Sequence, residues 1–209
     1  MMAPSKLVHV VDDDRAVRDS LRYLLEGEGL EVRTYASAEE FLAASTDARP
    51  ACAVVDLRMP GMSGLELQEA LARRRVSLPL VFVTAHGDVS LAVTAMKRGA
   101  VDFVEKPFAD EYLVEAVRRA LDLQARGSGR EDDPAGAAAR SATLSRRERD
   151  VLAGVVDGKS SKVIGAELGI ATKTVEAHRY RIMVKLGAPS LAGLVRIVIQ
   201  NRLLDIPRR

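Results

Sequence analysis

The chain has 209 residues, of which 47% are hydrophobic and 29% charged, a composition that suits one large or two modest packed domains. Its single cysteine excludes an internal disulfide, and it has no apolar stretch long enough to span a bilayer, so we expect a protein of the reducing cytoplasm. The net charge of +2 hides an asymmetry, because residues 1–124 carry 15 basic and 20 acidic side chains whereas residues 143–209 carry 13 basic and 6 acidic ones. The two parts therefore predict different partners, and the basic part is expected to meet phosphate backbones.

Strand and helix patterns alternate through the acidic part of the chain. Strands are expected at 7–11, 31–35, 52–56, 80–84 and 101–105, and amphipathic helices at 14–26, 37–45, 63–74, 88–98 and 110–125. Ser37, Asp88 and Asp110 are the expected helix N-caps, Ser37 in a capping box with Glu40. This alternation predicts an α/β domain with a flavodoxin-like, doubly wound, five-stranded parallel sheet over residues 1–124.

A linker and a separate all-α domain are expected after the sheet. Residues 125–142 are rich in Gly, Ala and Ser and have no apolar period, although 137–140 can extend a helix. Residues 143–209 show four helix patterns, at about 145–157, 160–168, 172–187 and 190–204. Gly169 suits a tight turn and Thr172 a cap, which is typical of a helix-turn-helix. The small core is expected to contain Val163, Ile164, Leu168, Val175, Ile182 and Leu186.

Polar residues are expected to gather at the carboxyl edge of the sheet. Asp12 and Asp13 follow the first strand, Asp56 ends the third, Thr84 ends the fourth and Lys106 follows the fifth. Taken alone, the aspartates are typical of turns and the lysine of a surface. Together with Asp56 they favour a Mg²⁺ site in which a carboxylate accepts a phosphoryl group and the cations and hydroxyl neutralise its oxygens. None of His9, His86 and Cys52 has metal-ligand spacing; we interpret Cys52 as a packing residue and assign no role to His86.

The pattern Asp12-Asp13, Asp56, Thr84 and Lys106-Pro107 resembles the receiver domain of response regulators. The resemblance implies that Asp56 accepts a phosphoryl group from a histidine of a sensor kinase. It also implies that Mg²⁺ is held by Asp13, Asp56 and the backbone carbonyl of Arg58, with Asp12 acting mostly through a metal-bound water. The resemblance further implies that switching couples the phosphoryl group to Thr84 and Phe103, although an aromatic residue at such a position is also typical of a core.

Three stretches of the basic part, 144–152, 158–164 and 174–179, resemble the LuxR-type DNA-binding domain. With the receiver pattern, this resembles the NarL/FixJ class, and residues 84–89 and 190–196 resemble its FixJ-type branch. Two positions depart from the family pattern: Ser161, where Asn is common, and Gly165, where Ala is usual. Gly165 inside a helix is expected to cost up to ~1 kcal/mol relative to Ala.

The third helix of the basic part is the expected DNA-recognition helix. By position, Glu176, Ala177 and Tyr180 are the expected base readers. Further DNA-binding candidates, mostly for phosphate contacts, are Lys162, Thr172, Lys173, Thr174, His178, Arg179, Arg181 and Lys185. A solvated helix face is the alternative for this surface, and Arg179 can instead pair within the domain.

The resemblance implies a two-component response regulator and transcription factor rather than an enzyme. Its expected partners are a sensor histidine kinase, promoter DNA, the transcription machinery and a second copy of the chain, bound through the face formed by 88–98, 101–105 and 110–125. Two-fold symmetry predicts roughly palindromic operators. Two alternatives remain open: a Mg²⁺-dependent phosphatase or phosphotransferase with Asp56 as nucleophile, and a constitutive DNA-binding protein whose receiver is only a dimerisation scaffold.

Overall fold

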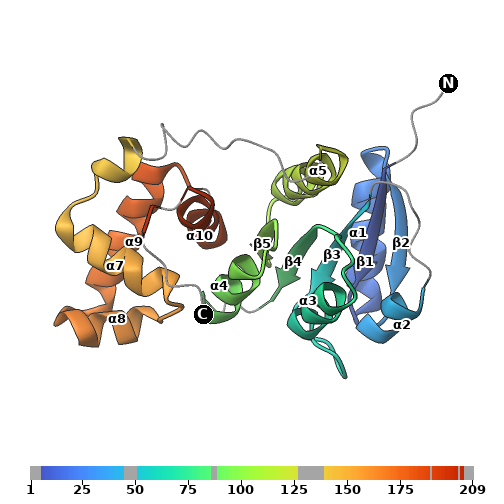
Figure 1. Cartoon of the computed structure of the whole chain (residues 1–209), viewed down its shortest axis with the longest axis horizontal. Helices are drawn as coiled ribbons and strands as arrows, with labels where there is room; N and C mark the ends of the chain where they lie inside the picture. The colour runs from blue at the N-terminus through green and yellow to red at the C-terminus, as the bar shows by residue number, and fades with distance from the viewer. Residues whose placement is uncertain are drawn as a thin grey trace. The chain divides into compact units, whose positions relative to one another are not determined.

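A computed structural model describes residues 6–44, 51–85, 89–126, 139–188, 190–201 and 203–204. Internal contacts divide the chain into two units, Met1–His86 with Ala100–Arg130 and Gly87–Gly99 with Glu131–Arg209 (Figure 1). Of the residues singled out in the sequence, His86, Asp88 and most of the expected linker lie outside the described part. Residues 139–142, at the end of that linker, are helical.

The first unit is built on a five-stranded parallel sheet. Its strands are β1 (Leu7–Val11), β2 (Glu31–Tyr35), β3 (Ala51–Asp56), β4 (Leu80–Thr84) and β5 (Asp102–Glu105), in the order β2-β1-β3-β4-β5. This is the flavodoxin-like order, so the predicted fold class is confirmed. The three central strands β1, β3 and β4 are buried along their whole length, as expected for a parallel sheet covered on both faces.

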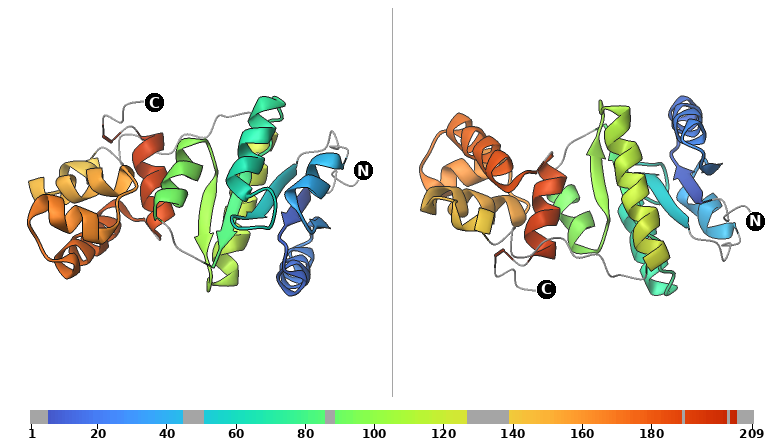
Figure 2. Two further views of the ribbon diagram at one scale, coloured as in Figure 1. Left: turned by 90° about the horizontal axis from the view of Figure 1, so that it is seen from below. Right: turned by 90° about the horizontal axis from the view of Figure 1, so that it is seen from above.

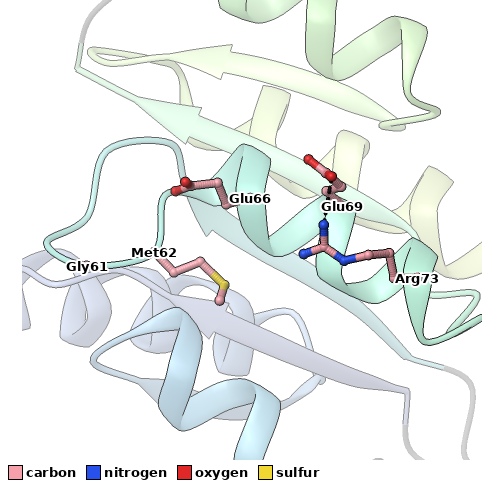
Figure 3. Close-up of a pocket in the computed structure, with 5 residues that line it drawn as sticks. All are labelled: Gly61, Met62, Glu66, Glu69 and Arg73. Atoms are coloured by element: carbon pink, nitrogen blue, oxygen red, sulfur yellow. Dashed lines mark hydrogen bonds and ion pairs between the residues drawn. The ribbon is translucent and has the colours of Figure 1, made fainter.

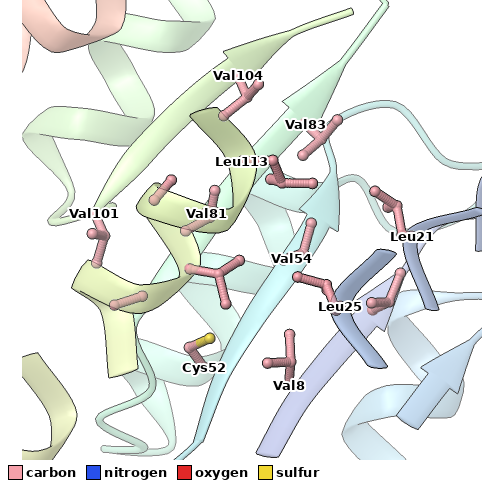
Figure 4. Packing of buried hydrophobic residues seen from close by; sticks show 14 of the residues in the cluster. Val8, Leu21, Leu25, Cys52, Val54, Val81, Val83, Val101, Val104 and Leu113 are labelled. Carbon is pink, nitrogen blue, oxygen red and sulfur yellow. The ribbon is translucent and has the colours of Figure 1, made fainter. Parts of the chain in front are cut away.

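Helices cover both faces of this sheet. They are α1 (Arg15–Gly27), α2 (Ala38–Ala43), α3 (Gly64–Arg73) and α5 (Asp110–Arg126), and Figure 2 shows α3 and α5 on opposite sides. Aliphatic residues of α1 and α5 pack with alternate strand residues such as Val8, Val54 and Val81 into one core, which also holds the fully buried Cys52 (Figure 4). On the other face, the rings of His9, Tyr35 and Phe41 form a buried cluster with centroid separations of 5.2–5.6 Å.

Helix starts in the first unit follow the sequence signals in part. Ser37 caps α2 by accepting a hydrogen bond from the Glu40 amide, but the Glu40 carboxylate accepts from Ala36 rather than from Ser37, so the expected capping box is not reciprocal. Asp110 is the first residue of α5 and not its cap. Its acidic side chain still lies in the first turn, where the helix dipole favours a negative charge.

The second unit contains α4 (Val89–Lys97) and the four helices expected from the basic part. These are α7 (Arg146–Val156), α8 (Ser161–Leu168), α9 (Thr172–Leu186) and α10 (Leu191–Gln200). Serines cap α7, α8 and α10, and Gly169 ends α8 in the left-handed conformation with φ of 66°, which makes the tight turn before α9. The predicted helix-turn-helix is thus formed by α8 and α9.

Two details of the predicted second unit were wrong. Thr172 is the first residue of α9, and the cap position is Ala171, which has no side-chain hydrogen bond. Val163 is 44% exposed, whereas Ile164 is 1% exposed. Neighbouring helix residues point about 100° apart, so the inward direction of Ile164 turns Val163 towards solvent.

Candidate functional site

Buried polar residues meet at the carboxyl edge of the sheet. Asp56 is the last residue of β3, Thr84 is the last residue of β4, and Asp12 follows β1. In the register of the sheet Asp56 faces Val83, one residue before Thr84, so these strand ends lie next to each other. Asp12, Asp56 and Thr84 are only 3%, 8% and 1% exposed. The edge therefore places two carboxylates and a hydroxyl-bearing residue away from bulk water.

Lys106 brings a positive charge to the two carboxylates. Its Nζ lies 3.2 Å from Asp12 Oδ2 and 3.9 Å from Asp56 Oδ1. Its backbone amide donates to the Thr84 carbonyl at 2.8 Å, which continues the pairing of β4 and β5 beyond the strand end. The peptide bond to the following Pro107 is cis. Lys106 is thus held by its backbone and reaches both carboxylates with its side chain.

Asp56 is the carboxylate with the altered acidity. Burial raises its pKa from 3.8 to about 6, helped by the negative charges of Asp12 and Asp13 and opposed by the Arg58 amide and by Lys106. The Arg58 amide donates to Asp56 Oδ2 at 2.7 Å. Because one oxygen accepts this bond and the other lies on the side of Lys106, Asp56 has a fixed orientation and a charge that is incompletely compensated.

The donor set fits a hard divalent cation. Asp12 and Asp56 supply buried carboxylates, Asp13 is an exposed residue close enough to raise the pKa of Asp56, and Arg58 follows two residues after Asp56. Among the described residues, no group of three or more acidic, histidine or cysteine side chains is arranged as a metal site. A cation here would therefore complete its shell with a backbone carbonyl and water, which Mg²⁺ accepts readily because it keeps several of its own waters.

The loop after β3 depends on a glycine and on a carboxylate from α2. A Cβ on Gly64 would lie 2.5 Å from the Asp56 carbonyl oxygen, so only glycine allows α3 to start this close to β3. Glu39 accepts a hydrogen bond from the Met62 amide at 2.9 Å, and its Oε1 lies against Gly61, where φ is 76°. The loop between Asp56 and α3 is thus held near its α3 end.

Phe103 is 4% exposed and pairs with Phe82 across β4 and β5. The preceding Asp102 is fully buried, accepts from the Phe103 amide at 2.8 Å and forms an ion pair with Arg119 of α5. The Tyr112 hydroxyl lies 3.3 Å from the same carboxylate. The strand that carries Phe103 is therefore joined to α5 by a buried polar network.

The exposed face of α9 carries the expected base readers. Glu176, Ala177 and Tyr180 are exposed, Tyr180 by 66%, and lie three and four residues apart on one face of the helix. Five further DNA-binding candidates are exposed: Lys162, Thr172, Lys173, Thr174 and Arg181. The opposite side of α9 is anchored by the fully buried Val175 and Ile182.

The other three candidates are half-buried, and two of them are bound within the second unit. Arg179 Nη1 donates to Ser161 Oγ at 2.7 Å, so the side chain that departs from the family pattern joins α8 to α9. Lys185 donates to Glu148 at 2.7 Å and to the Thr143 carbonyl at 3.2 Å. His178 is half-buried, and its Nδ1 is enclosed without a hydrogen-bond partner.

A shallow pocket of about 280 Å³ lies beside α3, and neither Asp12 nor Asp56 lines it (Figure 3). It is lined by Gly61, Met62, Glu66, Glu69 and Arg73. Its polar groups are already bound locally, because Glu66 accepts from the Ser63 amide at 2.8 Å and Glu69 pairs with Arg73 at 2.7 Å. It therefore lacks the convergent free polar groups of a ligand site.

Sequence reasoning missed the residues that hold the two acidic loops. Glu39 binds the loop after β3, and Arg18 of α1 binds carbonyls of the loop after β1. Both resemble ordinary charged residues on a solvated helix face, and no spacing rule identifies them. Gly64 had a weak signal only, because it follows Gly61 in a turn-rich stretch.

Two family models match the chain. Residues 8–118 match the response regulator receiver domain, and residues 142–198 match the bacterial regulatory proteins of the luxR family. The first match contains the carboxylate cluster and the second contains α8 and α9.

Similar proteins cover both parts at once. The chain is 46% identical to the transcriptional regulatory protein FixJ of Rhizobium meliloti, over 92% of this chain and 94% of that protein. It is 45% identical to the transcriptional regulatory protein TdiR of Thauera aromatica, over 93% and 86% of the two chains. Among solved structures, the response regulator StyR has a TM-score of 0.57 and 43% identity, covering 94% of this chain and all of that one. Full-length FixJ from B. japonicum has a TM-score of 0.52 and 40% identity, covering 95% and 98%.

Proposed function

We propose that Asp56 is the phosphoryl acceptor of this chain. The premise is that the chain belongs to the FixJ-like response regulators, which join a receiver domain to a LuxR-type DNA-binding domain. Proteins of this family regulate transcription under the control of phosphorylation. The observation that carries the assignment is the position of Asp56 at the end of β3, 3.9 Å from Lys106 and next to the buried Asp12. The partner donating the phosphoryl group would be a phosphohistidine of a sensor kinase in the cytoplasm.

Phosphoryl transfer would form a P–O bond to an Asp56 oxygen while the P–N bond of the phosphohistidine breaks. The Arg58 amide orients one Asp56 oxygen, and Lys106 provides a cation for the incoming phosphoryl oxygens. Receiver domains in general bind Mg²⁺ at this site, and here Asp13, Asp56 and the Arg58 carbonyl would hold it, with Asp12 acting through a bound water. The bound metal would neutralise negative charge on the transferred group.

The response to phosphorylation would begin at Thr84 and Phe103. Thr84 ends the strand next to Asp56, and Phe103 lies on β5 beside the buried network of Asp102 and Arg119. We expect the phosphoryl group to attract Thr84 and to let Phe103 repack. The surface of residues 88–98, 101–105 and 110–125 would then support a homodimer, and this surface stays a prediction.

The output would be promoter DNA bound by two copies of α9. The first turns of a recognition helix meet base edges in the major groove, which supports Glu176, Ala177 and Tyr180 as readers. The exposed Lys162, Lys173 and Arg181 suit phosphate contacts, together with Thr172 and Thr174. Because Arg179 and Lys185 are bound within the unit, we assign them to positioning α9 before any phosphate contact.

Membership in the family favours this function over the two alternatives. A phosphatase with Asp56 as nucleophile would need a second acid or base beside it and a substrate pocket, whereas the similar proteins are named as regulatory proteins. A constitutive DNA-binding protein would bind operators equally well with and without phosphorylation. No helix in the described part of the chain is long and apolar enough to cross a membrane.

The test uses pure full-length protein with Mg²⁺, with and without acetyl phosphate, and the Asp56→Asn variant. We expect the parent to gain the mass of one phosphoryl group, to dimerise and to bind operator DNA more tightly, whereas Asp56→Asn should do none of these. Phosphorylation of Asp56→Asn to the same extent would refute the assignment of the acceptor. Equal DNA affinity of the parent in both states would favour the constitutive alternative.

A further inference from the structure

The loop that carries the first two acidic residues is bound by one residue of the following helix. Arg18 Nη1 donates to the Asp12 carbonyl at 2.7 Å and to the Asp13 carbonyl at 2.9 Å. The Arg18 backbone amide donates to the Asp14 carbonyl at 3.0 Å. Three successive carbonyls thus bond to a single residue, which is itself half-buried.

The side chains of Asp12 and Asp14 are held by other partners. Asp12 Oδ1 accepts from the Asp14 amide at 2.9 Å, and Asp12 Oδ2 pairs with Lys106. Asp14 caps α1 by accepting from the Ala16 amide at 2.8 Å. Asp13 differs, because its side chain is exposed and its backbone carbonyl accepts a hydrogen bond from a side chain. The guanidinium of Arg18 supplies that bond, and a charged donor makes it stronger than a neutral one.

We propose that Arg18 is a positioning residue for Mg²⁺ binding at the acceptor site. By holding the Asp12 and Asp13 carbonyls it keeps the loop that carries both carboxylates close to Asp56 before the metal arrives. The loop then loses little conformational freedom on binding, which increases affinity. This role rests on the proposed function of Asp56 and adds a residue that touches neither metal nor phosphoryl group.

A general charge effect is the competing explanation, and Arg15 separates the two. Arg15 is the first residue of α1, also carries one positive charge near the acidic loop, and is 87% exposed. It pairs with Asp19 at 3.5 Å on the surface. Removing either arginine changes the net charge equally, but only Arg18 bonds to the carbonyls.

The experiment measures Mg²⁺ affinity by calorimetric titration of metal-free, full-length protein. The variants are Arg18→Gln, Arg18→Met, which keeps an apolar stem without donors, and the matched control Arg15→Gln. We expect both Arg18 variants to bind Mg²⁺ about ten-fold more weakly, as is typical when a residue supporting a metal ligand is removed. The control should bind like the parent.

A second readout separates positioning from chemistry. At saturating Mg²⁺, phosphorylation of the Arg18 variants by acetyl phosphate should approach the parental rate, because the metal then imposes the loop geometry. Melting curves show which variants are folded. If neither Arg18→Gln nor Arg18→Met folds, Arg18 is needed for folding rather than for positioning, and the proposal is overturned.

Parental Mg²⁺ affinity in either folded Arg18 variant, or an equal loss in Arg15→Gln, would also overturn it. Failure of the parent to be phosphorylated at Asp56 would refute the proposed function instead. The Mg²⁺ titration does not depend on that result, so the two failures are distinguishable.

Discussion

Replacing Asp56 with asparagine removes a buried negative charge while keeping the shape of the side chain. The asparagine oxygen still accepts from the Arg58 amide, and Lys106 keeps its ion pair with Asp12. Since burial raises the pKa of Asp56 from 3.8 to about 6, ionising it in the folded, metal-free protein costs about 3 kcal/mol more than in the unfolded chain. The side chain is largely shielded from water, so solvent screening reduces this cost little.

The sign of the pH dependence follows from the order of ionisation. As pH rises from 4 to 6, the unfolded chain releases the Asp56 proton first, so the stability of the parent's first unit falls. The asparagine of the variant has no proton to release. The variant should therefore match the parent near pH 4 and exceed it above pH 6 by about 3 kcal/mol, or about 10 °C in melting temperature.

Differential scanning calorimetry of the full-length protein with a chelator, from pH 4 to pH 8, measures this difference. The second unit lacks the substitution, so its transition serves as an internal reference. Asp19→Asn is the matched control, because Asp19 is a half-exposed carboxylate on α1 whose surface pairing contributes little. A stability difference that stays constant over the pH range, or a less stable Asp56→Asn variant at pH 7, would refute the reasoning.

Three further substitutions test the packing around the two sites by melting curves. Lys185→Met should lower the stability of the second unit by about 2 kcal/mol at pH 7, because Glu148 loses its partner. The hydrogen bond from Lys185 lowers the pKa of Glu148 from 4.5 to about 2, so this loss of stability should shrink as the pH falls from 4.5 towards 2. Gly165→Ala should be destabilising, because the added Cβ would lie 2.7 Å from a backbone carbonyl oxygen. The overpacking cost of about 2 kcal/mol outweighs the gain in helix propensity of about 1 kcal/mol, and a higher melting temperature would contradict this. Asp102→Asn should cost about 3 kcal/mol, because Arg119 loses its buried ionic partner and keeps only the exposed Glu115. An unchanged melting temperature would mean that Glu115 and water are sufficient to solvate Arg119.

Local patterns were sufficient to predict the sheet and its acidic edge. Buried parallel strands have continuous apolar runs, and in a parallel sheet their carboxyl ends meet at one edge, so Asp12, Asp56 and Thr84 could be expected to lie at the same edge. The resemblance to the receiver family then supplied the roles of the residues. The expected cost of Gly165 relative to alanine was based on helix propensity alone. The close approach of the turn to Gly165 decides the effect of an added methyl group, and helix propensity gives no sign of it.

Contacts of long side chains with residues distant in the sequence could not be predicted. Whether Arg179 meets a phosphate or Ser161 depends on the angle between α8 and α9, which the sequence does not specify. The same holds for Lys185, whose partner Glu148 lies 37 positions away. Arg18 and Glu39 act on carbonyls and amides, and backbone groups are the same at every position, so pairing rules based on residue type do not detect them.

The chain's single cysteine offers a route to measuring the switch by site-specific labelling. Cys52 is 0% exposed in the described structure, and burial raises the pKa of its thiol to about 12. A thiol with so little thiolate reacts slowly with maleimides and spin-label reagents. Cysteines introduced at Tyr23 on α1 and Tyr180 on α9, which are 85% and 66% exposed, can therefore be labelled while the native residue stays intact. Such a pair reports the distance between the two units before and after acetyl phosphate is added, without first engineering a cysteine-free protein.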